Sequence, residues 1–188
     1  MNMGIIIAFV ILGVIIVGIV SGGVAIYNRL VMLKYNVDKN FANIDVILKQ
    51  RVDEIPNLIA VVKKTQGYEE SLLNQLTELR TAFLSSRSTD EKVQLANEVG
   101  KLLNSFFAVS ENYPELKAVE SFRTLQLRVS DLADMLPDRR ELYNESVNMY
   151  NIGIHEMPAL LFARPMGYTD KPLLHISEEE KKYDGIRF

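Results

Sequence analysis

Two acidic residues and a lysine lie at helical spacing in the first charged part of the chain. Asp45, Lys49 and Asp53 follow one another at intervals of four, which places them on one face of a helix. Two carboxylates on one face could bind a metal ion or act as an acid–base pair. The lysine between them favours a ladder of surface ion pairs instead, each contributing roughly 0.3 kcal/mol.

Other residue types that carry chemistry are scarce. His155 and His175 have no second histidine three or four residues away, whereas a zinc site needs several convergent ligands. The chain has no cysteine, which excludes a disulfide framework and a thiolate metal site. It also contains no G-x-S-x-G, no H-E-x-x-H and no phosphate-binding glycine loop. We therefore predict no enzymatic activity, no cofactor and no metal ion.

Charge divides the chain into an apolar leader and a charged body. The formal net charge is -3, and all 21 basic and 24 acidic residues follow Asn28. This balance argues against nucleic acid as a partner. We expect an external N-terminus over residues 1–3, a transmembrane helix over 4–26, a cytoplasmic helical bundle over 27–157, and a tail over 158–188 that packs on the body or binds a partner.

The leader, "GIIIAFVILGVIIVGIVSGGVAI", has the length of a membrane-spanning helix. Its 23 uncharged residues span roughly 34 Å as a helix, against about 30 Å for the hydrocarbon core of a bilayer. A cleaved signal peptide would have a basic start and a shorter apolar run, so we predict a retained anchor in the lipid bilayer. Arg29, Lys34 and Lys39 follow it and no basic residue precedes it. The positive-inside rule then predicts a single-pass protein of the inner (plasma) membrane, with its N-terminus outside and its body in the cytoplasm.

Small residues on the leader could bring two membrane helices together. Gly18 and Gly22 form a G-x-x-x-G pattern, which permits close helix–helix contact in lipid. Glycine is also common in membrane helices without such a role.

The body has the periodicity of helices throughout. Between Val37 and Val62 the apolar residues recur with a mean spacing of about 3.6, which predicts one long helix kinked at Pro56. Further helices are predicted over 69–84 and 88–110, the second opening with a capping box of Ser88 and Glu91. A fourth, long helix is predicted from Pro114 to Pro158, with a kink at Pro137.

The predicted fold class is all-α: an N-terminal transmembrane helix followed by an antiparallel up-down bundle, with two long helices (first and last) and a short helical hairpin between them. The half nearest the membrane would then be mainly a helix pair. Two helices alone cannot bury wide apolar stripes, so we expect other subunits or the C-terminal tail to cover this half. The tail segments "ALLF" and "PLLHI" are apolar enough to do so, whereas "EEEKK" is typical of a solvated charge run.

A Tyr-Asn pair occurs four times, twice near each end of the body. The up-down path brings all four together, where tyrosine rings can be buried with their hydroxyls bonded and asparagine amides can fix helix register. We predict a helix–helix clasp rather than a ligand site, closing within one subunit or between two. The clasp residues are Tyr27, Asn28, Tyr35, Asn36, Tyr143, Asn144, Tyr150 and Asn151. Asn43, Arg51 and Asn57 flank the apolar stripe of the first long helix and are expected to set its register as well.

Three stretches of the body resemble the LemA family. They are "YNRLVMLKYNVDKNFANIDVILKQRVDEIPNLIAVVKK", "YPELKAVESFRTLQ" and "RRELYNESVNMYNIGIHEMPALL". The resemblance implies a bacterial protein of the cell envelope with one N-terminal membrane helix and a cytoplasmic helical bundle, and it brings no established enzymatic activity. The chain departs from the family at Ile47, where many members have Gln, and at Met157, where Phe is common before the proline.

These observations favour a non-enzymatic, single-pass membrane protein with a structural or scaffolding role. Its helical body would form a homo-oligomer through apolar helix stripes at the membrane face. The alternative is an adaptor or regulator of a membrane protein partner, such as an envelope protease. The two differ in whether the purified chain associates with itself or with one other protein.

Overall fold

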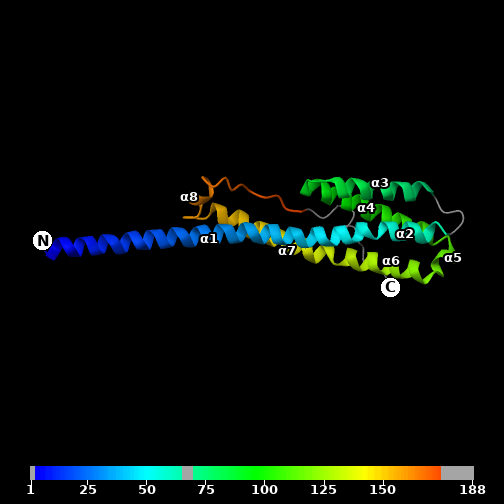
Figure 1. The fold of residues 1–188 in the computed structure, drawn as a ribbon, viewed down its shortest axis with the longest axis horizontal. Helices are drawn as coiled ribbons and strands as arrows, with labels where there is room; N and C mark the ends of the chain where they lie inside the picture. The colour runs from blue at the N-terminus through cyan, green and yellow to red at the C-terminus, as the bar shows by residue number, and fades with distance from the viewer. Residues whose placement is uncertain (1–2, 65–69, 175–188) are drawn as a thin grey trace, which may run out of the picture. The chain divides into compact units, whose positions relative to one another are not determined.

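The computed structural model describes residues 3–64 and 70–174, and within these ranges it contains helices and no strand. The chain divides into two compact units, Met1–Phe41 with Arg140–Phe188, and Ala42–Arg139. We call them unit 1 and unit 2. The helices are α1 (Met3–Asp53), α2 (Ile55–Val62), α3 (Glu70–Ser85), α4 (Thr89–Ser110), α5 (Pro114–Lys117), α6 (Glu120–Asp134), α7 (Leu136–His155) and α8 (Leu160–Ala163) (Figure 1).

The apolar leader forms the first part of α1. Its most apolar window is wholly exposed, and α1 is the one helix of the described ranges long and apolar enough to cross a membrane. Exposed Ile, Val and Phe side chains of this density cost free energy in water. Their transfer into hydrocarbon is favourable, so the length and composition of the leader fit a membrane-spanning segment.

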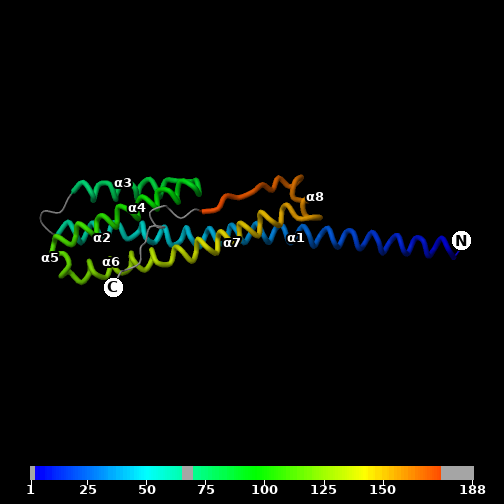
Figure 2. The backbone as a smooth tube through the Cα atoms, turned by 180° about the vertical axis from the view of Figure 1, so that it is seen from behind, coloured from blue at the N-terminus to red at the C-terminus, as the bar shows by residue number. Residues whose placement is uncertain are grey.

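In unit 1, α1 and α7 lie side by side and run in opposite directions, as Figures 1 and 2 both show. Arg29 Nη2 lies 2.9 Å from Glu156 Oε2, and the Asn40 amide donates to the Leu142 carbonyl at 3.3 Å. The numbers rise along α1 as they fall along α7, which is the signature of an antiparallel pair. The helices touch through buried side chains of both, which include Leu30, Leu33, Val37, Val147 and Ile154.

The chain after α7 folds back along unit 1. The Phe162 ring of α8 lies 3.6 Å from the position that a Cβ of Gly23 would take. Gly167 has φ +69°, a left-handed conformation that glycine adopts at little cost. After it, residues 168–174 have no regular secondary structure and hydrogen-bond to α7 at Asn151 and Asn144.

Unit 2 holds a second apolar core. α3 and α4 pack as a helical hairpin, and α2 packs against both α3 and α6; the pairing of α3 with α4 is visible in both views (Figures 1 and 2). The largest side chains with less than 2% exposure in this core come from every helix of the unit; they are Phe83, Phe106, Phe122, Ile44, Ile55, Leu58, Leu76, Leu103 and Leu116.

Two long helices of the sequence prediction are interrupted. The first breaks at Glu54, two residues before Pro56, and resumes as α2. The predicted fourth helix is three helices, because Val119 takes an extended conformation (ψ 113°) and Met135 separates α6 from α7. Leu116 and Phe122 both stay buried across the first of these breaks, whereas Val119 is 38% exposed. Apolar spacing alone could not detect this break, since it continues through Val119.

The predicted capping box at the start of α4 is wrong in its side-chain contacts. Ser88 occupies the N-cap position with extended backbone, but its side chain makes no capping hydrogen bond. The Glu91 carboxylate instead accepts a 2.7 Å hydrogen bond from the Ser86 hydroxyl. The spacing therefore located the helix start correctly, while the partner of Glu91 lies two residues earlier than predicted.

Candidate functional site

The Tyr-Asn pairs of α7 face two different neighbours. Tyr143 and Tyr150 are 5% and 2% exposed, and the Tyr143 ring meets the Phe41 ring of α1 edge-on, with centroids 5.9 Å apart. Seven residues correspond to about two helical turns, so Tyr143 and Tyr150 share one face. Asn144 and Asn151 each lie one residue further along the helix, and their side chains contact the chain segment that follows α8.

Asn144 and Asn151 each hold one residue of the tail by its backbone. The Asn144 amide donates to the Leu174 carbonyl and its carbonyl accepts from the Leu174 N–H, both at 2.9 Å. Asn151 makes the same two bonds to Lys171, again at 2.9 Å. We call Asn144 and Asn151 with residues 168–174 the asparagine ladder.

The spacing of the ladder agrees with the rise of an α-helix on one side and of an extended chain on the other. Seven residues of α-helix rise about 10.5 Å, while three residues of polyproline II chain rise about 9.3 Å. A polyproline II chain repeats every three residues, so residues 171 and 174 present their backbone groups to the same side. Pro172 lies between them and restricts the residue before it to extended conformations. The heptad spacing of the asparagines therefore fits the segment that they hold.

Charged and aromatic contacts flank the ladder. Lys171 Nζ lies 2.6 Å from Asp38 Oδ1 of α1 and 5.7 Å from the centre of the Tyr150 ring. His155 Nε2 lies 2.9 Å from Asp170 Oδ1. His155, Asp170 and Asp38 are exposed, while Lys171 is half-buried; ion pairs at the surface contribute little to stability. The four amide–backbone bonds carry the specificity for an extended chain.

The Tyr-Asn pairs of α1 are not part of the ladder. Tyr27 and Tyr35 are 50% and 67% exposed, and Asn28 and Asn36 are exposed as well. The structure brings the Tyr143 ring against Phe41 of α1, the Tyr150 ring beside Tyr168 and Lys171 of the tail, and Asn144 and Asn151 to the backbone of the tail. A clasp that joins all four pairs stays a prediction.

The polar residues expected to set register lie in unit 2. Arg51 is 8% exposed, and its Nη1 lies 2.9 Å from the position that a Cβ of Gly100 would take. Asn57 donates to Glu54 Oε2 at 3.0 Å, and Asn43 is exposed. Glu54 is itself buried and pairs with Arg128 of α6 at 2.8 Å. Sequence reasoning missed Glu54, because a single acidic residue in a charged stretch gives no sign that it is buried and paired.

The surface ion pairs predicted among Asp45, Lys49 and Asp53 of α1 are present only in part. Lys49 pairs with Asp53 at 2.7 Å, as predicted, but Asp45 pairs with Lys92 of α4 at 3.0 Å. The expected Asp45–Lys49 step is therefore wrong, since α4 supplies a nearer cation. Among residues 3–64 and 70–174, no three His, Cys, Asp or Glu side chains lie close enough together to hold a metal ion.

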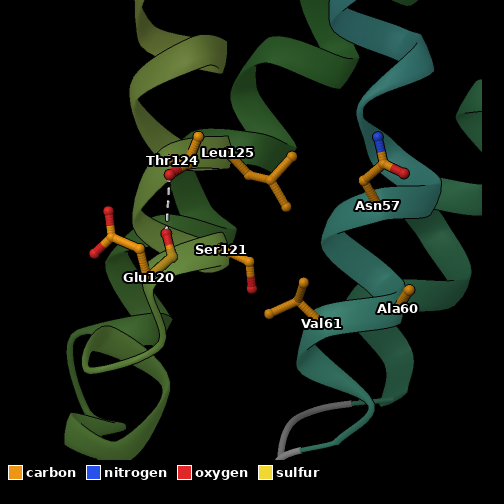
Figure 3. Close-up of a pocket in the computed structure, with 7 residues that line it drawn as sticks. All are labelled: Asn57, Ala60, Val61, Glu120, Ser121, Thr124 and Leu125. Atoms are coloured by element: carbon orange, nitrogen blue, oxygen red, sulfur yellow. Dashed lines mark hydrogen bonds between the residues drawn. The ribbon is translucent and has the colours of Figure 1, made fainter.

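An open groove of about 580 Å³ lies between α2 and α6 in unit 2. Figure 3 shows Asn57, Ala60 and Val61 of α2 facing Ser121 and Leu125 of α6. Glu120 is the one charged residue of its lining, and its carbonyl accepts a 3.0 Å hydrogen bond from Thr124. The groove could hold an apolar side chain between Ala60, Val61 and Leu125.

The Tyr150 phenol gives a spectroscopic readout of the packed tail. Burial raises its pKa above 10.0, and Tyr168, Asp170 and Asp38 raise it further, against a hydrogen bond from the Thr169 backbone. The neutral phenol is thus favoured in the fold. The resulting stabilisation is present below the unfolded pKa near 10 and is lost as the pH rises through the raised folded pKa.

We expect Tyr150→Phe to remove a phenolate absorbance step that lies above pH 10, the ordinary tyrosine pKa. Tyr35→Phe, at an exposed position, should leave that step in place. A step removed by Tyr150→Phe at or below pH 10 would contradict the burial of this hydroxyl.

Comparison with known proteins places the chain in a family. Its described residues form an all-helical protein with one long, apolar N-terminal helix. A model of the LemA family matches residues 40–188, and the chain belongs to the LemA family. The resemblance drawn from the sequence is confirmed. The match begins at residue 40, so it covers most of the body and the tail.

The chain is similar to three magnetosome proteins. It is 22% identical over 158 residues to magnetosome proteins MamQ 1 and MamQ 2 of Paramagnetospirillum magneticum, covering 70% of this chain and 58% of each relative. It is 19% identical over 175 residues to magnetosome protein MamQ of Magnetospirillum gryphiswaldense, covering 79% and 64%. The chain thus spans about 58–64% of the length of these relatives, and none of their names states an enzymatic activity.

Proposed function

We propose that this chain is a non-enzymatic, single-pass membrane protein whose cytoplasmic helical body self-assembles at the membrane face. Large apolar side chains that stay exposed in unit 1, beyond the apolar leader, carry this proposal. Met32 and Tyr35 of α1 are 55% and 67% exposed, and Met149 and Ile152 of α7 are 54% and 60% exposed. In an antiparallel pair that joins residue 29 to 156, these four lie at the same level along the helices. Exposed apolar groups that gather into one patch mark interaction surfaces, and these four would contribute to such a patch.

The leader supports the same proposal from the membrane side. Gly18 and Gly22 have no atom of another element near the positions that their Cβ atoms would take, so this face is open to a second helix. Arg29, Lys34 and Lys39 favour a cytoplasmic body. The protein would act as an envelope scaffold in which membrane helices and cytoplasmic faces contribute to the same assembly.

We expect replacement of Gly18 and Gly22 by leucine to weaken self-association about tenfold, because leucine keeps two membrane helices further apart. Gly13→Leu is the matched control, since Gly13 also has free space around it but lies on the opposite side of the helix. The measurement is the mass distribution of the full chain in gentle detergent or lipid nanodiscs. A monomer for the unchanged protein would contradict self-assembly, and equal weakening by Gly13→Leu would contradict the glycine face.

The groove between α2 and α6 favours a second function, that of an adaptor for a membrane enzyme. Its lining is mostly small or apolar, which suits an apolar side chain of another protein. Val61→Arg at this groove should abolish capture of such a partner and leave self-association unchanged. The converse result, loss of self-association alone, would count against the adaptor.

A further inference from the structure

The asparagine ladder recognises a backbone rather than a particular side chain. Within residues 3–64 and 70–174, the side chains of Asn144 and Asn151 bond to the N–H and C=O of Leu174 and Lys171, groups that almost every extended peptide presents. The side chains add a preference for a cation that can reach Asp38 and the Tyr150 ring. The class of ligand is therefore an extended peptide with two bonded residues. The first bonded residue is a lysine, and the second follows it by three positions.

The Tyr168 ring anchors the start of the segment in the ladder, beside the Tyr150 ring and under Lys34, whereas the part from Lys171 to Leu174 buries little apolar surface. Pro172 and Leu173 are exposed, while Lys171 and Leu174 are half-buried. The His155–Asp170 pair is exposed on both sides, and in the Lys171–Asp38 pair the carboxylate is exposed; ion pairs at the surface add little. Segments with little apolar burial open far more often than the core of a domain, so the face of α7 that carries Asn144 and Asn151 is accessible to a competing chain.

We propose that this face of α7 is an exchangeable peptide-binding site, and that it takes the segment Tyr168–Leu174 from a second copy of the chain. The inference rests on the proposed self-assembly. A second copy offers the same lysine, proline and leucine in the same register, so every contact of the ladder is available between chains. Anchoring of both copies in one membrane raises the effective concentration of the second segment. A reciprocal exchange would also satisfy two-fold symmetry.

The first test measures binding of a free tail peptide to the full-length protein. Lys171→Pro with Leu174→Pro removes the two N–H groups that donate to the asparagines and frees the site. A fluorescent peptide of residues 168–174 should bind this variant saturably, and binding should weaken about tenfold or more when Asn144→Asp and Asn151→Asp are added. Asn148→Asp is the matched control, because Asn148 is an exposed asparagine of α7 between them. Absence of saturable binding, or equal binding to the Asn144/Asn151 variant, overturns the site, provided that circular dichroism finds the helices intact.

The second test asks whether the segment crosses between copies. The chain has no cysteine, so single thiols can be placed freely. One tagged full-length chain carries Leu173→Cys in the tail, and a second, differently tagged chain carries Asn148→Cys with the two proline substitutions. On oxidation in the membrane, a disulfide between the two chains should form, and Asn144→Asp with Asn151→Asp in the second chain should reduce its yield about tenfold. The exchange is overturned if the second chain gives the same yield of mixed disulfide with Asn144→Asp and Asn151→Asp as with both asparagines intact.

The outcome also separates this proposal from self-assembly. If the unchanged protein is oligomeric by mass but the mixed disulfide does not depend on the asparagines, exchange fails and self-assembly stands. If the protein is a monomer by mass and no mixed disulfide forms, both fail.

Discussion

Phe122→Ala should lower the free energy of unfolding by about 3–5 kcal/mol, the range for removal of a buried phenylalanine ring. Phe122 of α6 is 1% exposed, and its ring centroid lies 6.3 Å from that of Phe106 and 6.1 Å from that of Phe107, both of α4. Aromatic groups in such tilted contacts contribute beyond their buried area. The alanine leaves a cavity between α4 and α6 that neither helix can fill without moving its backbone.

The measurement is the loss of helical circular dichroism with temperature for the full chain in detergent. Leu127→Ala is the matched control, since Leu127 lies on the same helix and is 57% exposed. It should change the unfolding free energy by about 0.5 kcal/mol or less. A Phe122→Ala protein that unfolds like the Leu127→Ala protein would mean that the three rings do not form one core. Because the leader remains helical in detergent, only part of the helical signal should be lost.

Such core residues could be predicted from sequence. Phe106 and Phe122 both follow the apolar spacing of their helices, and the structure buries both. Helical spacing is a robust signal because every buried position repeats it. The start of α3 and the bounds of α4 were likewise predicted to within about two residues, the usual uncertainty of helix ends. The arrangement of the whole bundle stays a prediction.

The breaks within the helices were harder to predict. Val119 continues the apolar spacing, yet it is extended and 38% exposed. Nothing in residue type marks it, because a valine is as compatible with a helix interior as with a short extended link. Pro56 and Pro137 did mark the interruptions at Glu54 and Met135, since proline is tolerated only in the first turn of a helix.

Only the asparagines of the asparagine ladder could be inferred from the sequence. The heptad spacing of Asn144 and Asn151 indicated a specific partner, but the predicted partner was another helix. The structure places the backbone of residues 171 and 174 there instead. Backbone groups leave no trace in residue types, so only the spacing around Pro172 could have indicated them. An asparagine heptad and a proline-containing tail are informative when they are compared with each other.

Gly153→Val should separate α1 from α7 and lower the stability of unit 1 by about 1–3 kcal/mol, the usual range for an overpacked contact. A Cβ on Gly153 would lie 2.4 Å from Cδ1 of Leu33, and Leu33 is 9% exposed. Glycine in a helix interior is ordinarily unfavourable by about 1 kcal/mol relative to alanine. Its presence in α7 is explained by the close approach of the Leu33 side chain.

A compensating substitution tests this explanation directly. Leu33→Ala alone should destabilise unit 1, because it leaves a cavity above Gly153. Together with Gly153→Val it should recover much of the lost stability, since valine fills the space that leucine vacates; the two changes are then strongly non-additive. Hydrogen exchange of the α7 amides measures the effect locally, and Gly13→Val in the leader controls for the loss of a glycine as such. Additive effects of the two substitutions would mean that Gly153 does not set the approach of α7 to α1. Non-additivity would instead show that this contact fixes the helix face on which Asn144 and Asn151 are presented to the tail.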